Sequence, residues 1–329
     1  MFFILKMVSS AEIKASNALL TDATAPLISV FVGGTSGIGK LTIKALVETG
    51  ASTRIYLIGR ESSEQRAQAF IQELSGINPK AEIVWIQGEV SLLADTKRVC
   101  EVIKAKEESR VDLLFLTTGY APFGPRTETS EGIEVAQSLE YYSRMLFVIH
   151  LLPLLNKAEA PRVVSVLGGG LEKPTSLDLD DLDLQKPGNF NGIKAQMQYT
   201  TMNTTTLDKL AHENQHITFI HSWPGWVSTG NVRRGRPNLL MAWFVWLFLE
   251  PLIKMFSFSD DESAQRHLFQ CTSAAFGGRG VKSIQTDGGL FLVNYKCDCT
   301  PNAKVMSVLR ETAQETVWRH TQDVLRPYL

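Results

Sequence analysis

The sequence has little of what a secreted, nucleic-acid-binding or membrane-anchored protein needs. Its four cysteines among 329 residues are too few for a disulfide framework, and its apolar start is too short for a secretory signal. The formal charge of −1 comes without a basic face, which argues against nucleic acid or an anionic membrane as a partner. We therefore expect a cytoplasmic protein that acts on a small molecule.

Long apolar runs and metal-ligand patterns are also scarce. The apolar run at 239–249 is shorter than the about 18 residues that a bilayer requires, so we expect no transmembrane span. We interpret 239–256 as a lid over an apolar substrate pocket; the alternative is a surface at 239–253 that contacts a membrane or a second copy of the chain. Cys297 and Cys299 lack a second pair of ligands, and no metal site is predicted.

The chain does contain a regular alternation of short apolar runs and helical patterns. Strand-like runs lie at 27–32, 54–58, 82–87, 111–116, 162–167, 216–221 and 289–293. Helical patterns lie at 37–49, 62–75, 92–108, 130–157 and 197–214. Apolar strands separated by helices predict an α/β fold, a doubly wound Rossmann-type parallel sheet with helices on both faces. We expect a single domain at 27–329 behind a helical extension at 1–26, with a helix at 9–20.

A glycine-rich turn follows the first predicted strand and opens the first long helix. It contains Gly33, Thr35, Ser36, Gly37, Ile38 and Gly39. Glycines let the backbone approach a pyrophosphate, and the N–H groups and positive dipole end of the next helix attract its charge. In parallel sheets, ligands bind beyond the carboxyl ends of the strands, where this turn would lie. The turn therefore predicts a dinucleotide site.

The end of the second predicted strand indicates which dinucleotide binds. An acidic residue there binds a free ribose 2′-hydroxyl, whereas an arginine accommodates a 2′-phosphate. A carboxylate would repel the 2′-phosphate, and this chain has Gly59 in its place. Arg60 follows and can donate two hydrogen bonds to the phosphate through its guanidinium group. The pair predicts NADP(H) as the cofactor; a merely solvated arginine is the alternative.

Over most of residues 27–295, the chain resembles the short-chain dehydrogenase/reductase family. The family's T-G-x-x-x-G-x-G turn is matched at 32–39, with Val32 in place of the threonine. The resemblance implies further cofactor contacts after the third, fourth and sixth strands, at Glu89, Val90, Thr118, Gly119, Val227 and Thr229. The stretches around Glu131, Tyr142 and Val317 are similar to divergent members from fungal secondary-metabolite gene clusters.

The same resemblance indicates a catalytic end that has lost most of its usual residues. The family uses a serine, an asparagine and Y-x-x-x-K, in which the lysine lowers the pKa of the tyrosine and holds the nicotinamide ribose. Tyr199 matches the tyrosine, and Asn203 stands at the lysine position. The serine position falls on Gly168 and the asparagine position on Tyr142. The resemblance thus assigns catalysis to Tyr199, Asn203 and Tyr142, with Tyr199 and Asn203 also contacting the cofactor.

Without a nearby lysine, the direction of the chemistry is constrained. An ordinary tyrosine has a pKa of about 10, so Tyr199 is a poor base for alcohol oxidation but is already protonated for carbonyl reduction. Tyr142 is a candidate donor that would replace the missing serine. Ser165 is expected to be buried and bonded to backbone, and His221 is either an acid or base or a packed side chain. Nothing in the sequence selects Lys173 or Lys194 as a replacement cation.

Three functions follow from these residues. The first is an NADP(H)-dependent reductase that reduces a carbonyl or polarised alkene of a small apolar natural product, with Tyr199 as proton donor. The second is a non-redox isomerase, dehydratase or cyclase that uses Tyr199 for proton transfer. The third is a non-catalytic binding protein, because fold alone does not fix function.

Overall fold

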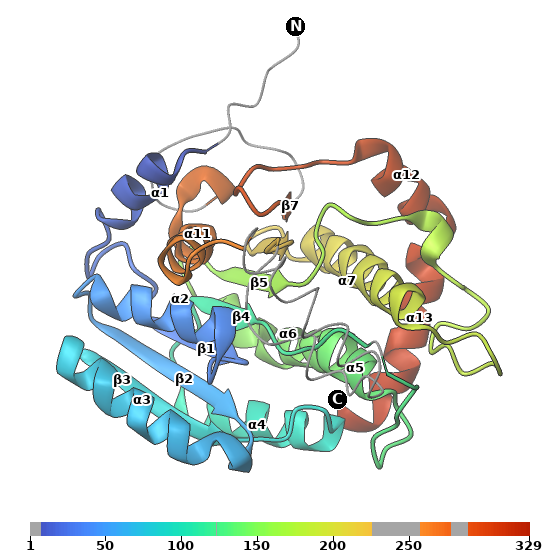
Figure 1. Cartoon of the computed structure of the whole chain (residues 1–329), viewed down its shortest axis with the longest axis horizontal. Helices are drawn as coiled ribbons and strands as arrows, with labels where there is room; N and C mark the ends of the chain where they lie inside the picture. Colours follow the sequence, from blue (N-terminus) through green and yellow to red (C-terminus); the bar gives the residue numbers. More distant parts are fainter. Residues whose placement is uncertain (1–7, 123, 226–256, 278–288) are drawn as a thin grey trace, which may run out of the picture.

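One parallel sheet forms the centre of the molecule. A computed structural model describes residues 8–122, 124–225, 257–277 and 289–329, and its sheet has seven strands in the order β3-β2-β1-β4-β5-β6-β7 (Figure 1). The strands are β1 (Ile28–Val32), β2 (Thr53–Gly59), β3 (Ala81–Gln87), β4 (Leu113–Leu116), β5 (Arg162–Val166), β6 (Thr218–Ser222) and β7 (Leu290–Val293). The expected parallel Rossmann-type sheet is confirmed.

Helices cover both faces of this sheet because alternate strand residues point to opposite sides. Phe31 and Leu57 belong to one buried cluster, whereas Val30 and Ile58 belong to the other. The first cluster includes residues of α1 (Ser10–Asn17), α2 (Gly37–Glu48), α3 (Glu64–Ile77) and α11 (Asp260–Thr272). The second includes residues of α4 (Leu93–Lys106), α6 (Ser143–Leu155), α7 (Gly192–Glu213) and α13 (Gln314–Leu325). The chain therefore has the expected doubly wound layers.

The predicted helix near the start of the chain is present and docks on a distant helix. Ser9 caps α1 by accepting a hydrogen bond from the Glu12 N–H. On the same helix, Lys14 pairs with Asp261 of α11 at 2.7 Å, and Ile13 is only 1% exposed. This packing attaches the N-terminal helix to the core, although the proposed boundary between 26 and 27 stays a prediction.

Several helix boundaries differ from the sequence predictions. The helix expected at 130–157 begins at α5 (Val135–Gln137) and continues through a π-helical turn, η2 (Ser138–Tyr142), into α6. The helix expected at 197–214 begins earlier, because Asn191 caps α7 by accepting a hydrogen bond from the Lys194 N–H. The sequence also missed α11, α12 (Ala303–Thr312) and α13. These differences change which side chains face the carboxyl end of the sheet.

Membrane-spanning helices and metal-binding clusters can be assessed only in the described part of the chain. Among its helices, none combines the length and the apolar character needed to cross a membrane. No group of three or more histidine, cysteine or acidic side chains suitable for a metal ion is found there either. The proposed lid at 239–256 and the contact surface at 239–253 lie outside the described residues.

The packing of α2 on the sheet gives a first prediction. Leu46 of α2 is 0% exposed, so Leu46→Ala leaves a cavity and lowers the free energy of unfolding by about 2–5 kcal/mol. Leu19, at 67% exposed, is the matched control, and Leu19→Ala changes it by less than about 0.5 kcal/mol. Denaturant titration of both variants checks this, and equal losses would contradict the assigned core.

Candidate functional site

The glycine turn after β1 is closely packed against the rest of the protein. Gly33 has φ of +97°, and a Cβ there would lie 2.7 Å from the Thr117 Oγ1 atom. A Cβ on Gly39 would lie 2.6 Å from the Gly33 carbonyl oxygen, which is incompatible with a side chain. Helix α2 begins at Gly37, and its first turn carries no acidic residue. The turn thus presents close backbone and the positive end of a helix to an anion.

The end of β2 leaves no room for an acidic side chain. A Cβ on Gly59 would lie 2.6 Å from Thr35 Cγ2 and 2.7 Å from the ring of Trp85. Arg60 follows directly and is exposed. At the position where the sequence predicts the adenosine ribose to bind, the chain thus has a glycine instead of an acidic residue, followed by an exposed arginine.

The other predicted cofactor residues lie along the same edge of the sheet. After β3, Glu89 is half-buried and accepts a hydrogen bond from the Ser91 hydroxyl at 2.8 Å, while Val90 is buried. After β4, Thr118 donates to the Leu139 carbonyl at 3.0 Å. Val227 and Thr229 lie outside the described residues. The carboxyl ends of β1 to β4 thus form one continuous edge.

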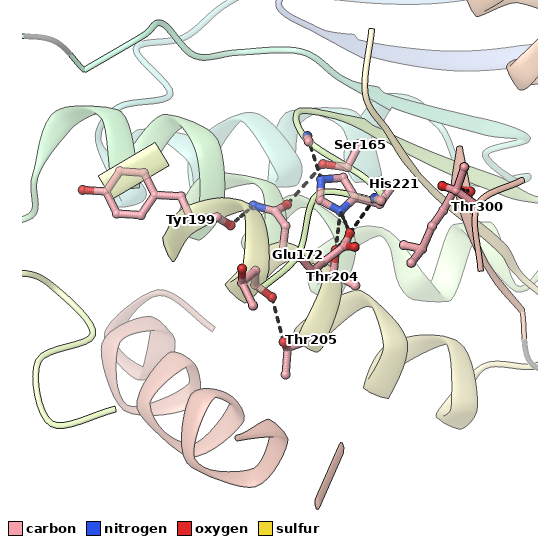
Figure 2. Close-up of polar contacts among 12 residues, drawn as sticks. Ser165, Glu172, Tyr199, Thr204, Thr205, His221 and Thr300 are labelled. Carbon is pink, nitrogen blue, oxygen red and sulfur yellow. Dashed lines mark hydrogen bonds and ion pairs between the residues drawn. The ribbon is translucent and has the colours of Figure 1, made fainter. Parts of the chain in front are cut away.

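Tyr199 is wholly buried and points away from Ser165 and His221 (Figure 2). Its hydroxyl donates to the Glu134 Oε2 atom at 3.0 Å. Burial raises the pKa of Tyr199, and the carboxylate of Glu134 raises it further. The charges therefore act on this phenol in the opposite sense to a lysine, and its proposed catalytic role stays a prediction.

Asn203 is also buried, and it connects three elements. Its Nδ2 atom donates to the Glu140 carbonyl at 2.7 Å and to the Tyr199 carbonyl at 3.0 Å. Its Oδ1 atom accepts from the Ser165 hydroxyl at 3.2 Å. These contacts hold α7 against η2 and β5, and any contact of Asn203 with the cofactor remains a prediction.

Tyr142 lies in a separate polar cluster beside α13. Its hydroxyl donates to Asp183 at 2.5 Å and is 2.9 Å from His320 Nε2. Burial raises the pKa of Tyr142, and the Asp183 carboxylate adds to that effect. The structure does not bring Tyr142 together with Tyr199 through any hydrogen bond that it describes, and its catalytic role is untested.

Comparison with known proteins identifies the family. A family model described as "KR domain" matches residues 28–121. The protein "Oxidoreductase AN1596" of Emericella nidulans is 35% identical over 336 residues, covering 97% of this chain and 98% of that protein. The chain belongs to the short-chain dehydrogenase/reductase family. The "NmrA-like family domain-containing oxidoreductase notO" of an Aspergillus species is 34% identical, covering 97% of this chain and 95% of that one.

A solved member of the family shares the fold at low identity. A carbonyl reductase from chicken fatty liver, solved with NADPH, superimposes with a TM-score of 0.55 at 17% identity, covering 85% of this chain and 99% of that one. The resemblance to divergent fungal members is confirmed by the relatives above. The chain is thus related to nicotinamide-dependent oxidoreductases of this family.

Thr200 of α7 lies beside the serine position of the family. A Cβ on Gly168 would lie 2.7 Å from both Oγ1 and Cγ2 of Thr200. One turn earlier, Gln196 donates through Nε2 to Oε2 of Glu140 at 3.1 Å. Gln196 and Thr200 thus face the ends of β4 and β5, and they keep the four-residue interval of Y-x-x-x-K.

Sequence reasoning missed Gln196, Thr200 and Glu140. For Gln196 the missed signal is the Asn191 cap, because a helix that begins at Gly192 already includes residue 196. No sequence signal marks the π-helical turn that contains Glu140.

Ser165 belongs to a buried network that differs from the sequence expectation. Its hydroxyl contacts two side chains, accepting from Arg144 Nη1 at 2.8 Å and donating to Asn203. The expected hydrogen bond to backbone is therefore wrong: the serine side chain faces α6 and α7, whose polar side chains Arg144 and Asn203 contact it. Arg144 also donates to the carbonyls of Val166 and Thr118. Burial lowers the pKa of Arg144 to about 10, so it remains a cation at neutral pH.

His221 connects β6 to the loop after β5. Its Nε2 atom accepts from the Gly168 N–H at 3.2 Å, and its Nδ1 atom lies 2.6 Å from Thr204 Oγ1 (Figure 2). Thr204 in turn donates to Glu172 at 2.6 Å. Burial lowers the pKa of His221 to about 3, so the ring is neutral and both nitrogens are engaged within the protein. This geometry favours the packed role over acid–base chemistry.

The contact between position 168 and α7 gives a second prediction. Restoring the family's serine with Gly168→Ser forces the new side chain into Thr200 and lowers the free energy of unfolding by about 1–3 kcal/mol. Adding Thr200→Ala recovers most of this loss, since the double variant removes the clash. Denaturant titration of the two single variants and the double variant measures the coupling. Additive losses would show that the two positions do not touch.

Proposed function

We propose that this protein is an NADP(H)-dependent reductase that acts on a carbonyl or polarised alkene of an apolar secondary metabolite. The observation that carries the cofactor assignment is the end of β2. Gly59 is packed against Thr35 and Trp85, and the exposed Arg60 follows it. A 2′-phosphate would meet donors and positive charge there, and position 59 carries no acidic side chain to repel it. The relation to fungal oxidoreductases supports the substrate class.

The residues fit a bound dinucleotide from one end to the other. The turn from Gly33 to Gly39 and the start of α2 would hold the pyrophosphate, because their N–H groups and dipole attract anions. Glu89 and Val90 would border the adenine, and Thr118 and Gly119 would border the nicotinamide half. When bound, the reduced nicotinamide supplies a hydride. The protein must then supply the proton.

Reduction is the direction that the buried charges favour. Burial and Glu134 raise the pKa of Tyr199, so this phenol stays protonated and cannot serve as a base near neutral pH. A protonated side chain is in the correct state to donate to a substrate oxygen. Tyr199, the donor that the sequence predicts, must first release Glu134 to reach a substrate.

The cofactor assignment has a direct test. Arg60→Ala removes charge-assisted hydrogen bonds worth about 1.5–3 kcal/mol, so NADPH affinity falls roughly 10- to 150-fold while NADH affinity is nearly unchanged. Arg66→Ala, which removes an exposed arginine of α3, is the matched control and alters neither. Calorimetric titration with both nucleotides measures this. Equal affinities for NADPH and NADH in the wild type would overturn the assignment.

Turnover separates the reductase from non-redox chemistry. With apolar ketones, aldehydes and enones as substrates, a reductase consumes one NADPH for each product formed, as followed by the loss of nicotinamide absorbance. Product that forms without NADPH consumption would instead favour an isomerase, dehydratase or cyclase.

A further inference from the structure

Glu140 is a buried carboxyl group at the carboxyl end of β4. It lies in the π-helical turn η2, and the residue is 2% exposed. Its Oε1 atom accepts from the Tyr120 N–H at 3.0 Å, and its Oε2 atom accepts from Gln196 at 3.1 Å. A Cβ on Gly119 would lie 2.7 Å from Oε1, so only a glycine lets the carboxyl group approach this closely. Insertions of π-helix into α-helices often occur at functional sites.

The surroundings of Glu140 keep it protonated near neutral pH. Burial raises its pKa to about 8; the Arg144 cation opposes this, and the Glu134 carboxylate adds to it. Tyr199 of α7 is the remaining ionisable group whose pKa responds to Glu140. A carboxylic acid held neutral by its site is a recognised way to supply a proton at pH 7.

Resting on the function proposed above, we propose that Glu140 is the proton donor of the reduction and that Gln196 orients its carboxyl group. Glu140 packs against Gly119 at the end of β4, and its partner Gln196 lies one turn of α7 before Thr200, which packs against the serine position Gly168. The acid therefore lies at the end of β4, next to the predicted nicotinamide site. Tyr199 is then a structural partner of Glu134.

The step balances without any further reagent. A reduced nicotinamide, when bound, would supply a hydride to the carbonyl carbon. As the C=O π bond breaks, the carbonyl oxygen would take the proton from the Glu140 carboxyl group. The products are the alcohol, the oxidised nucleotide and the Glu140 carboxylate. Solvent water then returns a proton to the Glu140 carboxylate, which it reaches along the half-buried Gln196 side chain.

Other buried carboxyl groups are less suited to this role. Glu134 accepts the Gln137 N–H at the start of α5 and the Tyr199 hydroxyl, both on Oε2. Glu172 is engaged with Thr204 and the Gly170 N–H. Of these three glutamates, Glu140 is the one packed against Gly119.

A measurement without substrate tests the protonation state. Because the pKa of Glu140 is about 8 in the folded protein and about 4.3 when unfolded, its contribution to stability is complete below the unfolded value and is lost as pH rises through 8. Glu140→Gln does not titrate, so its Tm rises relative to wild type between about pH 5 and about pH 9. A Tm difference that is constant with pH would overturn the proposal.

Infrared difference spectroscopy of the wild type measures the protonation state of Glu140 directly and does not require the Glu140→Gln variant to fold. A carboxylic-acid carbonyl band present at neutral pH should disappear with a midpoint near 8. Gln196→Leu removes a donor to the carboxylate and moves that midpoint upward. The absence of such a band at neutral pH would overturn the proposal.

Kinetics then assign the donor. Glu140→Gln lowers kcat roughly 10²–10⁴-fold, with NADPH affinity little changed. In the wild type, kcat falls as pH rises through the infrared midpoint, and Gln196→Leu moves both together. Glu172→Gln changes a buried glutamate elsewhere, is the matched control and keeps the wild-type rate.

A large loss of kcat in Tyr199→Phe with none in Glu140→Gln would overturn the proposal and return the role of proton donor to Tyr199. Absence of NADPH binding in the wild type would instead refute the proposed function.

Discussion

The carboxyl end of the sheet depends on the hydrogen bonds of one buried group, the guanidinium of Arg144. It donates to Thr118 after β4 and to Ser165 and Val166 of β5, so one side chain joins two neighbouring strands to α6. A buried cation of this kind is stable only when its donors are satisfied, and here they are directed at carbonyl and hydroxyl oxygens. The positions of the groups that surround the site follow from this arrangement.

Arg144 also explains why the site has an acidic character despite a cation nearby. Its N–H groups donate to β5, to the residue Thr118 after β4 and to Leu139 of η2, and none of its described hydrogen bonds reaches Tyr199. The phenol instead meets Glu134, and the pKa of Glu140 rises because burial outweighs the attraction of the guanidinium. The family's tyrosine has its pKa lowered by a lysine; in this chain, burial raises the pKa of Tyr199 and of Glu140, and both are held in their protonated form. A group that is protonated at neutral pH can act as a proton donor but cannot serve as a base.

Much of the fold could be predicted from the sequence because strand burial leaves a direct signal. A strand covered on both faces is mostly apolar, and the predicted runs match β1 to β7 within two residues at either end. The glycine turn was equally clear. The proposed catalytic face could not be predicted in the same way, because a sequence motif gives the spacing of residues but not the direction in which each side chain points. The π-helical turn changes which residues of the helix after β4 face the sheet, so Glu140 lies beside Gly119 while Tyr142 faces Asp183. A regular α-helix, which is what the sequence pattern predicts, would not give Glu140 and Tyr142 these orientations.

The two ends of the site differ in how much change each tolerates. At the nucleotide end, the geometry is set by backbone, and a single added Cβ at Gly33 or Gly39 would meet an atom within 2.7 Å. At the proposed catalytic end, side chains carry more of the contacts, and Asn203 fills the proposed lysine position with a neutral amide that still satisfies its neighbours. If the proposed site is correct, a fold of this kind can exchange its acid without disturbing the glycine turn. The presence of a dinucleotide turn thus says little about which residue supplies the proton.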